Sequence, residues 1–396
     1  MEYGKTLFKG MNFSELSRIS MDITLKPGSK EIESIVLADS SGWKKIIDDS
    51  GRAESKKIEE FIKVIIEKDP DVIEGYNLYS NILEVLLKKS AEHNIALNIG
   101  RDGLPVTKQS RFSRFDFDME KHKVIIPGRH FVDVLDLVTH FEYIKKTPDI
   151  NSLEKLAALL EVKDEISSKE EAAVYKNCIL SGKICDKLLP EMFYMNRIIS
   201  YNLGRLLKLN HPQKIDSILY REYLKQRYAI PLPGKSDPSL SGVNEIYYTG
   251  ELGPIISCSI ENLYQNSILQ SEVVLNEDPL NFVKGSLKKI IERSKIKESY
   301  AEVTENCEPE LLSALKNLSS GYFHYLNNPW VSFNSRLLAA DAIRIARETI
   351  EKIIKYVSFS GGIPVQIDHD EIIFVPPRDV INEELEQNFI SMLGKK

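Results

Sequence analysis

Two short apolar runs near the C-terminal end give the clearest hydrophobic pattern in the chain. The runs 365–367 and 372–375 are dominated by β-branched residues and flank the acidic tetrapeptide 368–371. Such runs on either side of a short polar tip are typical of a strand–turn–strand hairpin. Carboxylates are hard oxygen donors, so Asp368 and Asp370 are also candidate ligands for Mg²⁺. An ordinary solvated acidic turn would show the same pattern.

The first half of the chain alternates between strand-like and helix-like patterns. Short apolar runs that end at turn residues predict strands, whereas apolar residues spaced three or four positions apart predict helices. Gly128 separates two further apolar runs, 124–127 and 131–137. An alternation of this kind predicts an α/β domain. The predicted strands span 16–24, 33–38 and 72–73, and the predicted helices span 56–68, 82–91, 153–160 and 170–195.

The second half of the chain is richer in helices. A loop rich in Pro, Gly and Ser, 232–243, precedes an apolar stretch at 253–269. Further helices are predicted at 218–227, 282–300 and 335–356. The buried stripe of the last of these helices is expected at Leu338, Ala342, Ile345, Thr349 and Ile353.

A basic stripe runs along the predicted helix 282–300. Lys289, Arg293 and Lys297 follow one another at intervals of four, opposite an apolar stripe of Leu287, Ile290 and Ile291. The segment 284–297 holds six basic residues and one acidic residue, whereas the whole chain has a net charge of −6. Any contact with nucleic acid must therefore come from such a local face. A solvated helix face is the simpler interpretation, and a polyanion-facing surface is the alternative.

The composition bounds the class of protein. At 396 residues, of which 42% are hydrophobic, the chain is long enough for two or three globular domains. No apolar run approaches the roughly 20 residues that span a bilayer, and no signal peptide is evident. We therefore expect a soluble, cytoplasmic protein with no membrane contact. The scattered cysteines, Cys178, Cys185, Cys258 and Cys307, are expected to be free, buried thiols.

Several stretches of the first half carry a family resemblance. The stretches 67–77 (EKDPDVIEGYN), 98–105 (NIGRDGLP), 126–138 (IPGRHFVDVLDLV) and 188–199 (LLPEMFYMNRII) resemble the 3′–5′ exonuclease domain of family-B DNA polymerases. The resemblance implies an RNase H-like domain. In that domain, carboxylates from three motifs hold two metal ions that activate water and stabilise the leaving oxygen.

The chain keeps one of these carboxylates. The first motif, Asp-x-Glu in the family, is Asp22-Ile23-Thr24 here, and the second places Ser80, Asn81 and Ile82 where an Asp is expected. Glu84 is the nearest acid and is out of register. Asn177 and Ile179 are the candidates for the third position. The resemblance therefore implies an exonuclease scaffold without its chemistry, although Asp22 is also explained as a simple strand-end acid.

The second half resembles the palm domain of the same family. The run 228–231 is similar to the family's entry into the palm, and 262–265 matches the Ser-Leu-Tyr-Pro run of its first motif. This register puts Ser259 at the position of the catalytic Asp. It puts Tyr264 where the family packs a tyrosine under the incoming sugar, although a half-buried core aromatic would look the same. The segment 368–371 aligns with the Asp-Thr-Asp-Ser of the third motif and keeps both aspartates.

Two helical stretches are similar to the fingers of the family. The helix 282–300 resembles the first fingers helix, and 308–325 resembles the second, in which Lys316 aligns with a triphosphate-binding lysine. Helix 335–356 resembles a palm helix. The nucleotide-binding residues that the resemblance implies are Lys289, Arg293, Lys297, Lys316 and Tyr264.

The resemblance, which covers residues 15–377, implies a mixed α/β and α+β multidomain fold. We expect an RNase H-like exonuclease domain over 1–205, a palm over 206–275 and 319–396, reduced helical fingers over 276–318, and no thumb. Because Ser259 is neutral, we expect a degenerate polymerase homologue that does not catalyse nucleotide transfer. It would bind DNA, a nucleotide or a replication or repair protein.

Two catalytic alternatives remain. One is a minimal DNA polymerase or nucleotidyltransferase with residual activity that depends on Mg²⁺ at Asp368 and Asp370. The other is residual nuclease activity.

Overall fold

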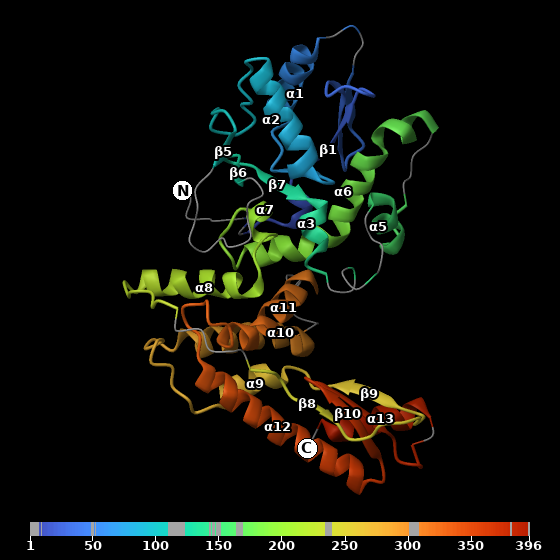
Figure 1. The fold of residues 1–396 in the computed structure, drawn as a ribbon, viewed down its shortest axis with the longest axis vertical. Coiled ribbons are helices and arrows are strands. Elements are labelled where there is room, and N and C mark those ends of the chain that lie inside the picture. Colours follow the sequence, from blue (N-terminus) through green and yellow to red (C-terminus); the bar gives the residue numbers. More distant parts are fainter. Residues whose placement is uncertain are drawn as a thin grey trace. The chain divides into compact units, whose positions relative to one another are not determined.

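The computed structural model divides the chain into two compact units, Met1–Lys208 and Leu209–Lys396 (Figure 1). The structure describes residues 10–48, 53–109, 123–141, 152–163, 169–233, 240–300, 309–380 and 382–394, together with Phe8, Gly51, Ile144 and Thr147. The side chains of 107–109, 123, 125, 169–173 and 295–300 are not described.

The first unit is built on a mixed five-stranded sheet with the order β3-β2-β1-β4-β7. β1 pairs antiparallel with β2, which pairs antiparallel with β3, whereas β4 pairs parallel with both β1 and β7. The strands are β1 (Arg18–Leu25), β2 (Ile32–Asp39), β3 (Lys44–Ile47), β4 (Val72–Gly75) and β7 (His130–Asp133), with β5 (Thr107–Gln109) and β6 (Lys123–Ile125) forming a separate pair.

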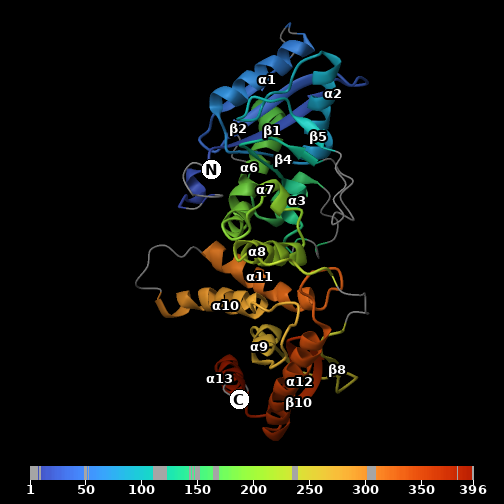
Figure 2. The ribbon, with the colours of Figure 1, turned by 90° about the vertical axis from the view of Figure 1, so that its left-hand side faces the viewer.

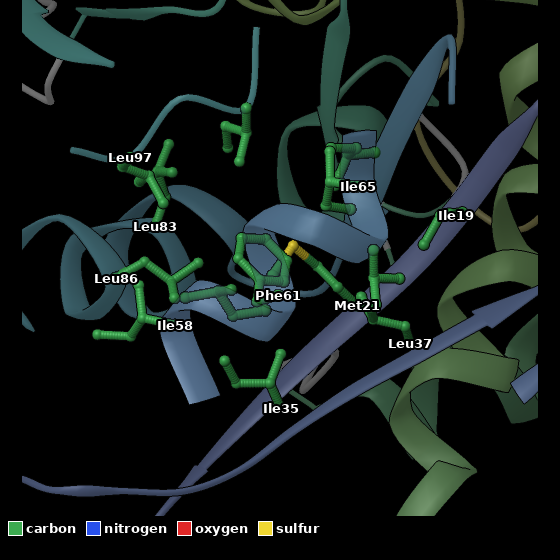
Figure 3. Packing of buried hydrophobic residues seen from close by; sticks show 14 of the residues in the cluster. Ile19, Met21, Ile35, Leu37, Ile58, Phe61, Ile65, Leu83, Leu86 and Leu97 are labelled. Atoms are coloured by element: carbon green, nitrogen blue, oxygen red, sulfur yellow. The ribbon is translucent and has the colours of Figure 1, made fainter. Parts of the chain in front are cut away.

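Helices cover both faces of this sheet, α1 and α2 on one side and α6 on the other (Figures 1 and 2). Figure 3 shows the core on the first side, where Phe61 of α1 and Leu86 of α2 pack with Met21 of β1. On the other side, Cys178 of α6 packs on Val36 and Ala38 of β2. The helices of this unit are η1 (Phe13–Glu15), α1 (Glu54–Lys68), η2 (Leu78–Leu83), α2 (Glu84–Glu92), α3 (Val134–Val138), α5 (Leu153–Leu159), α6 (Lys169–Asn196) and α7 (Leu203–Leu206).

The second unit contains an antiparallel four-stranded sheet with the order β8-β10-β11-β9. One face of this sheet packs on α12 and α13 through a core that includes Val357, Phe374 and Phe389. Most of the remaining helices lie in a separate layer of α8, α10 and α11, which contact one another. The elements are α8 (His211–Lys225), β8 (Asn244–Ile246), β9 (Ile256–Ser259), α9 (Leu263–Gln270), α10 (Phe282–Tyr300), α11 (Pro309–Leu326), α12 (Arg336–Phe359), β10 (Ile363–Asp368), β11 (Glu371–Val375) and α13 (Glu383–Leu393).

Local sequence signals explain where several of these elements begin. α8 starts at a capping box in which Asn210 and Gln213 bond each other's backbone N–H, with Pro212 in the first turn. The side chains of Ser335 and Asn382 cap α12 and α13 in the same way that Asp133 caps α3. The predicted C-terminal hairpin is confirmed as β10 and β11.

Three details differ from the sequence prediction. The buried stripe of α12 passes through Ala346 and Ile350, whereas Ile345 and Thr349 are only half-buried, because the side of the helix that packs on its neighbours is rotated from the predicted one. The predicted helix 82–91 is preceded by a π-helical turn, η2. The apolar run 131–137 changes from strand to helix at the Asp133 cap, because an N-cap side chain satisfies the first free N–H groups.

The cysteine and membrane expectations have separate outcomes. Cys178 and Cys185 are free and buried, whereas Cys258 is free but only half-buried. Cys307 lies outside the described residues. No helix in the described part of the chain is long and apolar enough to cross a membrane.

Candidate functional site

The exonuclease-like position in the first unit is built on the α6-facing side of β1. Strand residues alternate between faces, so Ile19 and Met21 enter the core beneath α1 while Ser20, Asp22 and Thr24 face α6. Asn177 of α6 donates through Nδ2 to Oδ2 of Asp22 over 2.7 Å. The sequence left Asn177 and Ile179 as alternatives for the third motif, and the structure brings Asn177 to Asp22.

The Asp22 carboxylate accepts hydrogen bonds within the first unit. Burial raises the pKa of the Asp22 carboxyl, while the bonds from Asn177 and the Ile23 N–H act in the opposite direction. Thr24 pairs through its hydroxyl with Ser34 over 2.7 Å. Ile82, one of the three residues in the second-motif window, is buried in the core. Thr24, Ile82 and Asn177, which the resemblance aligns with the exonuclease motifs, are thus all neutral residues engaged in internal contacts.

A buried ion pair lies on the same face of the sheet, at the start of β1. Arg18 Nη1 and Glu74 Oε2 are 3.1 Å apart, and both side chains are almost fully buried. Ser20 donates to the other oxygen of Glu74 over 2.9 Å, and Asp186 of α6 bonds Arg18 from the far side. Burial raises the pKa of Glu74, and the attraction of Arg18 opposes that rise. The sequence gives no signal for this pair, because its partners lie on separate elements.

The palm-like position in the second unit is set by the register of the sheet. Asp368 of β10 pairs with Glu371 of β11, and Glu371 pairs with Ser259 of β9. Residues that pair directly across neighbouring strands lie on the same face. Asp368 and Ser259 are therefore on one face but two strands apart, with Glu371 between them.

The carboxylates of this row have close polar neighbours. His369 Nδ1 lies 2.7 Å from Asp368 Oδ1, and Glu371 accepts a hydrogen bond from Ser257. His369, at the hairpin tip, has φ +58° and donates its N–H to the Val243 carbonyl over 2.8 Å. The Asp370 carbonyl accepts from the Ile260 N–H, which ties the tip to the end of β9.

The donor set can be compared with the requirement for two metal ions. No group of three or more His, Cys, Asp or Glu side chains in the described part of the chain is arranged to hold an ion. Two divalent ions need bridging carboxylates from both strands, and β9 offers Ser259 at that position. The residues present therefore do not fit a two-ion centre.

Tyr264 lies in the interior, with 8% of its surface exposed. Its hydroxyl oxygen accepts the Val243 N–H over 2.8 Å, and its ring lies 4.5 Å from the Phe323 ring, centroid to centroid. These contacts hold α9 against α11 and the start of β8. They leave little of the ring free to contact a sugar.

The basic residues singled out in the fingers-like helices have different surroundings. Lys289 and Arg293 are exposed on α10, opposite the buried Leu287, Ile290 and Ile291, as predicted. Lys316 of α11 forms an exposed ion pair with Glu261 at 3.3 Å. The side chain of Lys297 lies outside the described part of the chain. Lys284 does not belong to the basic stripe, because its Nζ donates to the carbonyls of Ser271 and Val273.

A cavity of about 480 Å³ lies beside the hairpin tip in the second unit. Its lining combines His369 and Asn244 with Phe323 and His324 of α11. The adjoining segment is anchored by Asn327, whose amide exchanges two hydrogen bonds with the Leu240 backbone.

Two acidic residues near these positions were missed by the sequence reasoning about sites. Glu371, the last residue of the acidic tip, lies between the two residues that align with the polymerase motifs. Asp133 ends β7, and burial raises its pKa to about 6, although N–H groups of Leu135 and Tyr79 bond it. An acid directly after a buried strand was the available signal for Asp133.

Comparisons with known proteins agree with this architecture. Residues 18–152 match the family model "DNA polymerase family B, exonuclease domain". A DNA polymerase of Archaeoglobus fulgidus is 23% identical over 376 residues, covering 84% of this chain and 46% of the relative. The DNA polymerase delta catalytic subunit of Dictyostelium discoideum is 27% identical over 205 residues, covering 46% of this chain and 18% of the relative.

A solved structure extends the likeness over almost the whole chain. The family B DNA polymerase of the hyperthermophilic archaeon Pyrobaculum calidifontis has a TM-score of 0.74 and 16% identity, and the match covers 96% of this chain and 55% of that one. The chain thus spans about half the length of the archaeal polymerases it matches. The predicted fold class is confirmed. Residues 18–152 match the exonuclease domain of family-B DNA polymerases, and the chain as a whole has the fold of those polymerases.

Proposed function

We propose that this protein is a degenerate, non-catalytic relative of DNA polymerases that acts in DNA replication or repair by binding. It would bind DNA, a nucleotide or a partner protein and would neither extend a primer nor degrade a strand. In this proposal the domains follow the expected division into an exonuclease-like domain, a palm and reduced fingers.

One observation carries the proposal: at both former metal positions a neutral side chain stands where an acid is required. Asn177 donates a hydrogen bond to Asp22, and Ser259 aligns beside Glu371. A metal ion contributes several kcal/mol of transition-state charge stabilisation in such reactions. Loss of a bridging carboxylate therefore removes most of the rate, while the fold that presents DNA-facing surfaces remains.

The cations of α10 support a binding role. Lys289 and Arg293 are exposed, one helical turn apart, on a helix whose opposite side is buried. An Arg guanidinium forks onto two phosphate oxygens, and a Lys ammonium acts as a point charge. This stripe is the local basic face that a chain of net charge −6 needs in order to bind a polyanion.

The test combines an activity assay with a binding assay on the full chain. We expect no primer extension and no cleavage of single-stranded DNA with either Mg²⁺ or Mn²⁺. In the same preparation, fluorescence anisotropy should detect binding of a primer–template duplex that weakens as salt rises. A purified sample that incorporates nucleotides, with the activity abolished by Asp370→Asn, would refute the proposal.

A matched pair of double variants locates the binding face. Lys289→Ala with Arg293→Ala should weaken duplex binding and reduce the slope of log K against log salt by about 1 to 2. Lys352→Ala with Lys355→Ala removes two exposed cations from α12 and should leave both unchanged. Equal losses in the two double variants would show that binding depends on overall charge and not on α10.

A second candidate is a minimal nucleotidyltransferase with residual Mg²⁺-dependent activity. It is favoured by the exposure of Asp368 and Asp370 at the hairpin tip, because a single Mg²⁺ needs only one or two carboxylates together with substrate phosphates. Calorimetry should then detect deoxynucleotide binding that requires Mg²⁺ and disappears in Asp368→Ala. Equal heats with and without Mg²⁺ would exclude this candidate.

A further inference from the structure

The second unit presents one open sheet face whose composition is unusual. The strand register assigns two full rows to this face: Ile246, Gln366, Ile373 and Ser257 form one, and Asn244, Asp368, Glu371 and Ser259 form the other. A third, shorter row is the pair Ile363 and Val375. The open face is defined by these residues.

The opposite face shows what a covered surface looks like in the same sheet. Its intervening row is Glu245, Ile367, Ile372 and Cys258. Ile372 and Cys258 pack into the core with α12 and α13, and Glu245 lies 3.7 Å from Arg347 of α12. Helices thus satisfy this face both with apolar contacts and with a cation.

The open face also carries both aliphatic and acidic side chains, but no helix packs on it in the described part of the unit. At its aliphatic half, Ile246 is 68% exposed and Ile363 44% exposed, beside the half-buried Ile373 and Val375. At its acidic half, Asp368 and Glu371 are exposed, with Asp370 at the adjoining tip. A solvated sheet face normally alternates to polar residues, so this run of aliphatic side chains is unexplained by solvent contact alone.

The charges of the face select the kind of partner. The four strands contain no Lys or Arg. A DNA backbone would place phosphates against Asp368, Asp370 and Glu371, which is repulsive without bound cations. A polypeptide that carries both aliphatic and basic side chains matches the aliphatic half and the acidic half together. Sheet faces in proteins are typically covered by amphipathic helices, as α12 and α13 cover the other face.

We propose that the open face of the palm-like sheet docks a basic amphipathic helix of a partner protein. The apolar stripe of that helix covers Ile246, Ile363, Ile373 and Val375, and Lys or Arg residues at one end pair with Asp368, Asp370 and Glu371. This inference rests on the proposed function, because it gives the surviving carboxylates a role in binding instead of metal-dependent catalysis.

Three synthetic 18-residue peptides test the inference against the full chain. The first has a leucine stripe and four lysines in its last turns, the second replaces the lysines with glutamates, and the third replaces the leucines with serines. Anisotropy in moderate salt should show that the first binds at least about tenfold more tightly than either of the others. Hydrogen exchange should slow in β8, β10 and β11 when it is bound.

Matched variants place the binding on the open face. Asp368→Asn with Glu371→Gln, and separately Ile246→Ser with Ile363→Ser, should each weaken the first peptide about tenfold. Glu383→Gln with Glu384→Gln removes the same charge from α13, and Ile66→Ser removes an exposed isoleucine of α1; both should bind as the unmodified protein does. Thermal melts establish that each variant is folded.

Three results would overturn the inference. The first is that the control variants weaken peptide binding as much as the face variants do. The second is that the face variants bind the first peptide as tightly as the unmodified protein does. The third is that a DNA duplex displaces the labelled peptide as effectively as unlabelled peptide does. Primer extension measured in parallel separates the two proposals. Extension with intact peptide docking refutes only the non-catalytic function, and no docking without extension refutes only this inference.

Discussion

Each unit carries an acid that the resemblance aligns with a metal-binding motif, and the surroundings of the two acids differ. In the first unit, Asp22 accepts a hydrogen bond from Asn177 at 2.7 Å and is partly buried against α6. In the second unit, Asp368 is 56% exposed and its neighbour across the hairpin, Glu371, is exposed as well. Asp22 is bonded within its unit, whereas Asp368 and Glu371 present their charges to the solvent.

The difference follows from the layers around each sheet. The first sheet is covered on both faces, so a charge facing α6 must be paired or neutralised within the protein. The second sheet is covered on one face, so its remaining acids keep their water and need no internal partner. An acid on a covered sheet face thus becomes part of the internal packing, whereas an acid on an uncovered face keeps its charge toward the solvent.

The largest expected effect concerns how much a buried ion pair contributes to the stability of the first unit. Arg18→Leu leaves Glu74 buried without its cation, because Arg18 and Glu74 are only 6% and 2% exposed. Breaking one partner of such a pair costs about 3 to 5 kcal/mol of unfolding free energy. Urea unfolding followed by the fluorescence of Trp43, in a Trp330→Phe background, reports this unit.

The control for that measurement is an exposed ion pair in the same unit. Lys63 is 72% exposed and lies 3.6 Å from Glu67 on α1, so Lys63→Leu should change the unfolding free energy by less than about 1 kcal/mol. Equal effects of Arg18→Leu and Lys63→Leu would contradict the view that the first unit depends on internal charge pairing.

The second prediction uses pH. Nδ1 of His130 accepts the Leu203 N–H over 2.9 Å, and burial lowers the pKa of His130 to about 4. The folded state therefore favours neutral His130, whose stabilisation is complete above pH 6.5 and is lost as pH falls toward 4. The loss should reach about 2 to 3 kcal/mol in the Trp43 transition, allowing for the partial exposure of the ring.

His130→Asn provides the comparison, since it keeps an acceptor near Nδ1 and does not titrate in this range. Its stability should fall less than that of the unmodified protein between pH 6.5 and 4. Asp133 acts in the opposite sense, because a folded pKa of about 6 makes its contribution fall as pH rises from 3.8 to 6. The informative quantity is therefore the difference between the two proteins, and identical pH profiles would exclude His130 as the cause.

The third prediction places an acid at one motif-aligned position in each unit. Asn177→Asp removes the donor to Asp22 and places two carboxylates together, which should cost about 1 to 2 kcal/mol at pH 8 and less at pH 4. Ser259→Asp lies on the exposed face and should cost less than about 1 kcal/mol. The Trp43 and Trp330 signals measure the two units separately, and a larger cost for Ser259→Asp would reverse the comparison.

The smallest expected effect belongs to the open face itself. Asp368→Asn removes an exposed charge whose neighbour, His369, is 47% exposed, so stability should change by less than about 0.5 kcal/mol. Hydrogen exchange of β10 and β11 amides should be almost the same in both proteins. A loss above 1 kcal/mol would show that Asp368 is part of the structure of the hairpin and not a free surface charge.

Much of the fold could be predicted from local patterns. The β-branched runs around 368–371 specify the hairpin of β10 and β11, and the spacing of Leu287, Ile290 and Ile291 specifies the buried side of α10. The stripe of α12 was placed slightly wrongly, because periodicity marks every apolar position equally. The burial of Ala346 and Ile350, and not of Ile345 and Thr349, depends on which side of α12 packs against its neighbouring elements.

The candidate sites could be predicted only in part. The sequence shows which motif-aligned positions carry acids, and Asp22, Asp368 and Asp370 were all identified from it. The hydrogen bond from Asn177 to Asp22 joins residues 155 apart in the chain and could not be predicted from local patterns. Likewise, the position of Glu371 between Asp368 and Ser259 depends on how β9 aligns with β11.

The sequence by itself determined the type and order of most elements and which motif-aligned positions carry acids, because propensity, periodicity and residue identity are local properties. The tertiary structure decided which surviving acids are paired internally and which face outward. Those outcomes depend on which helices cover which sheet face, and that is fixed by contacts between residues far apart in the chain.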